Sequence, residues 1–79
     1  MTRPVLTLYV GPGCHLCEDA RAQLGPLEQE LGFDVLEVDI SRDDALHRAY
    51  LERIPVGAIG GEELFEYFVD EGELRRRLA

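Results

Sequence analysis

Cys14 and Cys17 are the only cysteines in the chain, and two residues separate them. When such a pair lies on a helix, the two sulfurs are about one turn apart and within bridging distance. The chemistry open to the pair is thiol–disulfide exchange, in which one thiolate attacks a disulfide and the second thiol resolves the mixed disulfide. A C-x-x-C pair beside a strand–helix–strand pattern is a fairly specific signal for this chemistry. We therefore interpret both cysteines as catalytic.

The flanking sequence predicts that Cys14 begins a helix. Before it, the β-rich stretch 6–10 and the loop Gly11-Pro12-Gly13 indicate a buried strand followed by a turn. After it, apolar residues recur at helical spacing: Leu16, Ala20, Leu24, Leu27 and Leu31. Free N–H groups and the helix dipole favour an anion at that end, so a thiol pKa of about 8.5 can fall to roughly 3.5–7.5. We expect Cys14 to be the nucleophile and Cys17 the resolving thiol.

Two other interpretations of the cysteines remain. Cys17 could be a small buried hydrophobic residue. The protein could also be a redox-silent interaction domain in which Cys14 is unreactive. The pair could also bind a metal, but a structural zinc needs four ligands. The soft ligands in the chain are Cys14, Cys17, His15 and His47, but His15 lies between the cysteines with poor geometry for the same ion. One chain is therefore short of ligands, and we predict no metal site within it. A site shared by two chains, including an iron–sulfur cluster, is the alternative function.

Residues near the pair could assist it. A protonated His15 beside Cys14 would stabilise the thiolate, although a helix-surface histidine can also be merely solvated. Pro55 either begins a strand or forms a cis peptide with Ile54 against the dithiol. Only about 5–6% of X–Pro bonds are cis, so the sequence alone does not choose.

Length and charge limit the classes of function. The chain has 79 residues, and we expect one domain over 1–79 with a thin core. Its 8 basic and 16 acidic residues give a formal charge of −8. This charge argues against nucleic acid and anionic membranes and favours a partner with a basic docking face.

Localisation follows from the hydropathy pattern and the cysteine count. No run approaches the ~18 consecutive apolar residues of a membrane span, and the N-terminus lacks the apolar region of a signal peptide. We therefore expect a cytoplasmic protein. In a reducing compartment, two cysteines favour catalysis or metal binding over a structural disulfide.

The remaining elements follow from periodicity, caps and turn residues. We predict strands over 5–10, 33–40, 56–59 and 63–68, with Gly60-Gly61 in a hairpin turn. The first helix covers 14–31 with a kink or break at Gly25-Pro26, and Gly32 follows its end. The resulting order is βαβαββα.

Two further helices complete this order. We expect Ser41 to cap the second helix, whose inner face would consist of Leu46, Ala49 and Tyr50. The segment before Pro55 should end that helix, because the residue preceding proline avoids the helical conformation. Asp70, with Glu73 three residues later, should cap a short last helix.

These residues together resemble a small glutaredoxin-like protein of the thioredoxin superfamily. The resemblance rests on Cys14-His15-Leu16-Cys17, Val38-Asp39-Ile40, Arg53-Ile54-Pro55-Val56 and the closing hairpin and helix. It implies an α/β, thioredoxin-like fold in which three helices flank a four-stranded mixed sheet with an antiparallel third strand. It also implies an exposed nucleophile at Cys14, a cis Ile54-Pro55 peptide and an Ile54 backbone that pairs with the substrate main chain.

The resemblance also bears on substrates and cofactors. The substrate-binding residues would be Gly13, His15, Arg53, Ile54 and Pro55. The chain lacks the basic residue that glutaredoxins usually carry before the dithiol, and Gly60-Gly61 lies in the hairpin rather than after the last strand. The last helix begins with acidic residues, so Arg53 is the one nearby cation for a glutathione carboxylate.

We accordingly expect no tightly bound cofactor and weak binding of free glutathione, which remains a candidate reductant alongside thioredoxin. The expected partners are protein disulfides with basic residues around them. We also expect the protein to be a monomer.

Overall fold

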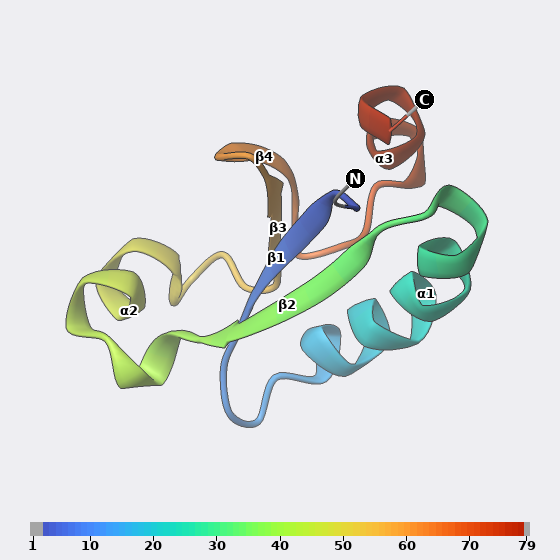
Figure 1. Ribbon diagram of the computed structural model, residues 1–79. Helices are drawn as coiled ribbons and strands as arrows, with labels where there is room; N and C mark the ends of the chain where they lie inside the picture. The colour runs from blue at the N-terminus through green and yellow to red at the C-terminus, as the bar shows by residue number, and fades with distance from the viewer. Residues whose placement is uncertain (1–2, 79) are drawn as a thin grey trace.

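The computed structural model describes residues 3–78, and its elements follow the predicted order (Figure 1). A short 3₁₀ helix, η1, precedes the second α-helix. The elements are β1 (Val5–Val10), α1 (His15–Leu31), β2 (Asp34–Asp39), η1 (Ile40–Arg42), α2 (Asp44–Tyr50), β3 (Val56–Ile59), β4 (Glu62–Glu66) and α3 (Glu71–Leu78).

The four strands form one mixed sheet in the order β2-β1-β3-β4. β1 runs parallel to β2, with Val5 opposite Asp34, and antiparallel to β3, with Leu8 opposite Gly57. β4 is antiparallel to β3. The antiparallel third strand and the three α-helices confirm the predicted thioredoxin-like α/β fold.

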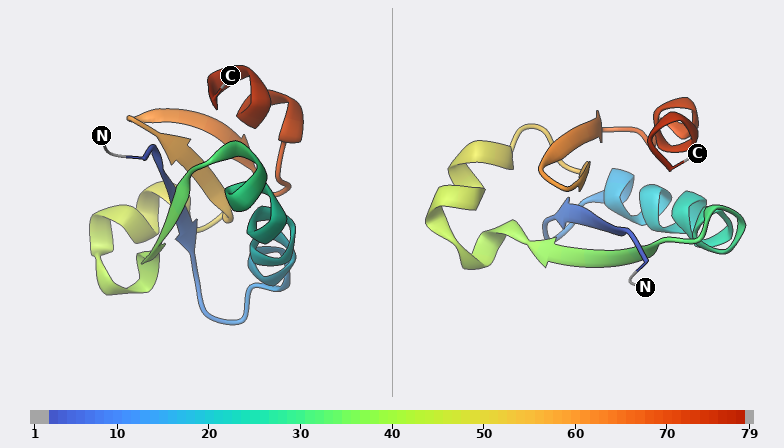
Figure 2. Two further views of the ribbon diagram at one scale, coloured as in Figure 1. Left: turned by 45° about the vertical axis from the view of Figure 1, so that its right-hand side comes forward. Right: turned by 45° about the horizontal axis from the view of Figure 1, so that its top comes forward.

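The core lies between one face of the sheet and the helices α1 and α3. Alternate residues of β1 face it, and α1 and α3 supply their apolar sides. The buried cluster includes Leu6, Leu8, Val10, Cys17, Ala20, Leu24, Leu27, Phe33, Ile59, Leu64, Phe65 and Leu74. Gly57 of β3 leaves room for the Phe65 ring, because a Cβ there would lie 2.3 Å from two ring atoms. Figure 2 shows that α2 lies at one end of the molecule, whereas α1 and α3 lie toward the other.

The sequence predicted a kink or a break at Gly25-Pro26, and a break is wrong, because α1 is a single helix through Pro26. Proline removes the bond to the carbonyl of Ala22, but Ala22 and Pro26 are exposed, so water can replace that bond. Gly25 has no Cβ to meet the proline ring, which relieves part of the usual clash before proline. Gly32 ends the helix as predicted, at φ 75° with its N–H donating to the Glu28 carbonyl.

The predicted cap of the second helix is also wrong. Ser41 lies in η1, and the N-cap of α2 is Asp43, whose carboxylate accepts the N–H groups of Ala45 and Leu46 at 2.9 and 3.1 Å. Ala49, predicted to face inward, is exposed, and α2 has no fully buried residue. The cause is that α2 is one short helix at the end of the sheet rather than a layer across it.

Strand and helix ends account for the other differences. β4 stops at Glu66 instead of residue 68, because Tyr67 has a positive φ of 66° and turns the chain. Asp70 accepts the Glu73 N–H at 3.1 Å as predicted, but the Glu73 carboxylate pairs with Arg76. No helix in the stretch 3–78 is both long and apolar enough to cross a membrane.

Candidate functional site

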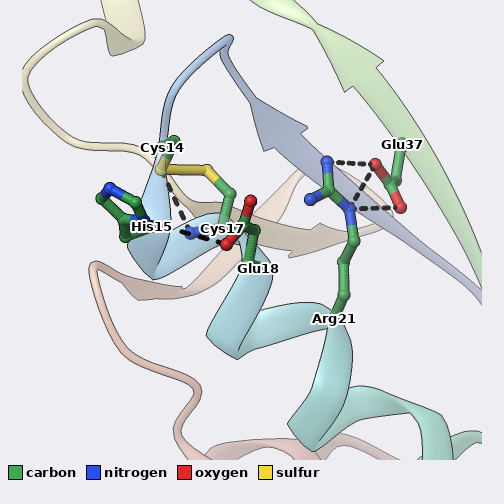
Figure 3. Close-up of a disulfide and its surroundings, with 6 residues drawn as sticks. All are labelled: Cys14, His15, Cys17, Glu18, Arg21 and Glu37. Atoms are coloured by element: carbon green, nitrogen blue, oxygen red, sulfur yellow. Dashed lines mark hydrogen bonds and ion pairs between the residues drawn. A yellow bond between two sulfur atoms is a disulfide. The ribbon is translucent and has the colours of Figure 1, made fainter.

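The two cysteines form a disulfide at the start of α1, with their Cα atoms 5.2 Å apart (Figure 3). Cys14 is the N-cap of the helix, and Cys17 lies in its first turn. Cys14 is half-buried, whereas Cys17 is fully buried. Only Cys14 can therefore be reached from solvent, which is the asymmetry that a nucleophile and a resolving thiol require.

The start of the helix provides a backbone donor to the Cys14 sulfur. Its Sγ accepts the N–H of Cys17 at 3.1 Å, in the place that a serine or aspartate oxygen usually takes at an N-cap. The Cys14 backbone has φ −91° and ψ 103°, the extended conformation of a capping residue. A thiolate at this position would meet the positive end of the helix dipole.

His15 points away from the disulfide. Its side chain is 93% exposed, and its Nδ1 lies 3.8 Å from Oε2 of Glu18, one turn along the helix surface (Figure 3). The imidazole therefore pairs with a carboxylate on the helix surface. Its predicted effect on a Cys14 thiolate remains a prediction.

The cis-proline loop packs directly against the loop that precedes Cys14. The Ile54-Pro55 peptide is cis, as the resemblance implied, and Pro55 is buried. A Cβ on Gly11 would lie 2.9 Å from Cδ1 of Ile54, so the two loops are in close contact. Gly13 has φ 70°, a conformation that favours glycine and turns the chain into the helix. The structure thus brings Ile54, which precedes Pro55, to the loop that leads through Gly13 into Cys14.

Of the two backbone polar groups of Ile54, one is available to pair with a substrate. Its N–H donates to the carbonyl of Tyr50 at 3.1 Å and is therefore occupied. Its carbonyl accepts no hydrogen bond from any residue between 3 and 78. Any pairing of Ile54 with a substrate main chain would use this carbonyl.

Arg53 is not the free cation that the sequence suggested. Its Nε donates to Glu66 at 2.7 Å, its Nη2 donates to Glu63, and its guanidinium lies 5.4 Å from the Tyr50 ring centroid. These hydrogen bonds, which Arg53 donates to Glu66 and Glu63, raise the pKa of Arg53 above its ordinary value. A glutathione carboxylate would have to replace one of these partners. The sequence did not reveal this pairing, because the two glutamates lie on a strand that follows ten and more residues later.

Sequence reasoning missed Tyr67 and Phe68, which it assigned to the last strand. The two side chains are 40% and 69% exposed. The Tyr67 N–H donates to the Pro55 carbonyl at 2.9 Å, and its hydroxyl donates to the Glu52 carbonyl. The available signal was two adjacent aromatic residues, since neighbours on a strand point to opposite faces and cannot both enter one core.

A groove of about 270 Å³ separates these aromatic residues from the first turns of α1. Its walls are Leu16, Asp19, Ala20, Ala22, Gln23, Tyr67, Phe68 and Val69. Leu16, which stands between the two cysteines in the sequence, is the lining residue nearest to them along the chain, and neither cysteine lines the groove itself. Among residues 3–78, no three His, Cys, Asp or Glu side chains form a group that could hold a metal ion.

Comparisons with known proteins agree with this geometry. The family described as "glutaredoxin-like domain (DUF836)" matches residues 5–79. An uncharacterised protein of Mycobacterium tuberculosis is 33% identical over 84 residues, which cover all of this chain and 87% of that protein. A glutaredoxin-like protein of Dictyostelium discoideum is 27% identical over 87% of this chain and 69% of its own length. A Nitrosomonas europaea protein solved by solution NMR is 31% identical, with a TM-score of 0.89 over all of this chain and 95% of its own.

Proposed function

The chain belongs to the glutaredoxin-like domain (DUF836) family, and from this premise we propose that it is a thiol–disulfide oxidoreductase. The observation that carries the proposal is the Cys14–Cys17 disulfide at a helix start, with the first cysteine partly exposed and the second buried. Cys14 is the nucleophile, and Cys17 is the resolving thiol. We further propose that the protein acts as a monomer in the reducing cytoplasm, where it contributes to redox homeostasis.

The reaction begins from the reduced protein. The Cys14 thiolate attacks one sulfur of a substrate disulfide, the substrate S–S bond breaks, and the leaving thiolate takes a proton. Cys17 then loses its proton and attacks the Cys14 sulfur of the mixed disulfide. This second step releases the other substrate thiol and forms the Cys14–Cys17 disulfide. Two electrons pass from the dithiol to the substrate.

The oxidised protein must be reduced before another turnover. A cellular thiol can do this, and the candidates are glutathione and a thioredoxin-type dithiol. The substrates that we propose are protein disulfides. Because Arg53 is already paired with two carboxylates, the chain offers little to hold the carboxylates of glutathione.

The test separates the two cysteines. The reduced Cys17→Ser protein should accumulate a stable mixed disulfide with a model disulfide, because no second thiol can resolve it. The Cys14→Ser protein should form no such adduct over the same time, because its remaining thiol is buried. Mass spectrometry under non-reducing conditions measures the adduct, and the wild-type protein should instead end as the internal disulfide.

The two serine variants are each other's matched control, since each removes one sulfur from the same turn. If Cys14→Ser forms the adduct and Cys17→Ser does not, the assigned roles are reversed. If the reduced wild-type protein reduces no disulfide, the proposed function is wrong.

A further inference from the structure

The groove that Leu16 helps to line has a mainly apolar lining and a fixed far wall. Leu16, Ala20 and Gln23 lie on one side of α1, because residues three, four and seven apart share a helix face. Opposite them, Tyr67 is tied at two points to the segment around Pro55, through its N–H and its hydroxyl. The wall is thus already in place before a ligand arrives, which reduces the entropic cost of binding.

The groove leaves large apolar surface uncovered next to a reactive centre. Phe68 is 69% exposed, more than any other large hydrophobic residue in residues 3–78. Exposed aromatic side chains that line a concavity are typical of binding sites for other molecules. A space of about 270 Å³ lies just below the range of small-molecule pockets, about 300–1,000 Å³, and suits a single large side chain.

The charges around the groove are negative. Asp19 lines it, and Asp70 and Glu71 follow Val69 on the surface. Asp19 makes no ion pair with any arginine or histidine between residues 3 and 78. Arg75, Arg76 and Arg77 of α3 are already paired with glutamates. A cation on the ligand would therefore form an ion pair with the Asp19 carboxylate, and a carboxylate on the ligand would be repelled.

We propose that the disulfide substrate is a polypeptide that carries a large apolar residue and a basic residue close to its cysteine. The apolar side chain occupies the groove between Leu16 and Phe68, and the basic side chain lies beside Asp19. Since Leu16 is two residues from Cys14, and a chain spans about 3.3–3.6 Å per residue, the apolar residue lies within about two positions of the substrate cysteine. This inference rests on the proposed function and specifies its substrate.

Four peptides test the inference. Each carries one cysteine as a mixed disulfide with a chromogenic thiol. Leucine or serine stands on one side of the cysteine, and lysine or glutamate stands on the other. Cys14 of the reduced protein attacks the peptide sulfur, the chromogenic thiolate leaves, and Cys17 then releases the peptide thiol. The second-order rate constant of chromophore release should be highest for the leucine–lysine peptide. We expect each replacement to lower it about three- to tenfold, and the corresponding glutathione mixed disulfide to be slower still.

Two groove variants and two matched controls assign the effect. Phe68→Ser should remove the preference for leucine, and Asp19→Lys should turn the preference for lysine into one for glutamate. Leu51→Ser changes an exposed apolar residue beyond the end of α2, and Asp44→Asn changes an exposed carboxylate of α2. Both control variants should keep all four rate constants.

The outcomes separate the two proposals. If the wild-type protein reduces none of the disulfides, the proposed function fails and the inference fails with it. If it reduces all four peptides at equal rates, or glutathione mixed disulfide fastest, the function stands and the substrate inference is overturned. Preferences that persist in both groove variants would also overturn it.

Discussion

At the scale of single residues, Cys14 and Cys17 have opposite surroundings although only two residues separate them. Cys14 caps the helix and accepts a backbone N–H at 3.1 Å, so its thiolate would be stabilised by this donor and by the helix dipole. Cys17 is fully buried in the apolar cluster with Leu8 and Leu24, and burial disfavours a charged sulfur. One helical turn thus creates two different thiols from the same residue type.

This contrast predicts the order in which the reduced protein ionises. We expect Cys14 to lose its proton at the lower pH, below the usual thiol pKa of about 8.5. Thiolate absorbance measured against pH should show one low transition in the wild-type protein. That transition should be retained in Cys17→Ser and absent from Cys14→Ser. A low transition that disappears only in Cys17→Ser would show that the two roles have been exchanged.

At the scale of elements, α2 differs from the other two helices in what stabilises it. α1 and α3 insert buried side chains into the core, whereas α2 has no fully buried residue. At its N-cap, one carboxylate oxygen of Asp43 accepts two backbone hydrogen bonds. At its end, Tyr50 stacks on Tyr9 of β1 with ring centroids 4.3 Å apart. Caps and one aromatic contact therefore replace burial in this helix.

Removing the cap should weaken α2 in particular. We expect Asp43→Ala to cost about 1 kcal/mol, within the 0.5–2 kcal/mol range of N-cap substitutions. Because α2 packs weakly, the loss should appear first as faster amide exchange of His47 and Leu51, whose N–H groups bond within the helix. Asp44→Ala is the matched control, since this exposed neighbour supplies none of the capping bonds. Equal exchange rates in the two variants would contradict the prediction.

At the scale of the whole molecule, the surface combines an acidic excess with arginine pairs that join distant elements. Arg75 of α3 bonds Glu30 near the end of α1 at 2.5 Å, and Arg21 of α1 pairs with Glu37 of β2 in a two-oxygen contact. Hydrogen bonding to Arg75 lowers the pKa of Glu30 below its ordinary value of 4.5. The chain as a whole has 16 acidic and 8 basic residues, which give the net charge of −8.

The Glu30–Arg75 pair predicts a specific pH dependence. A carboxyl whose folded pKa is lowered stabilises the fold above its ordinary value, and that stabilisation disappears as the pH falls through the folded pKa. The wild-type protein should therefore exceed Glu30→Gln in urea midpoint at neutral pH, and the difference should vanish in acid. The pair is exposed, so added salt should reduce the difference. Glu52→Gln, which removes a glutamate without an ion pair among residues 3–78, should show no such pH-dependent difference; if it does, the effect is one of net charge.

The sequence by itself determined the order of elements, the strand ends at Val10 and Ile59, and the cysteine pair at a helix start. These features depend on local periodicity, turn residues and the chemistry of neighbouring side chains. All of that information lies within a single short segment of the sequence. The resemblance added the cis Ile54-Pro55 peptide. The sequence alone did not predict that α1 continues through Pro26 or that Asp43 rather than Ser41 caps α2. Solvent exposure decided the first, and the position of α2 relative to the sheet decided the second.

Only the tertiary structure decided how the site is bordered. It paired Arg53 with Glu63 and Glu66 and so removed the cation that the sequence offered to glutathione. It also turned Tyr67 and Phe68 out of the last strand and set them opposite Leu16 across a groove. Such contacts join residues ten to fifty positions apart, and their energies depend on the distance between side chains. That distance is fixed only when the strands and helices have packed together.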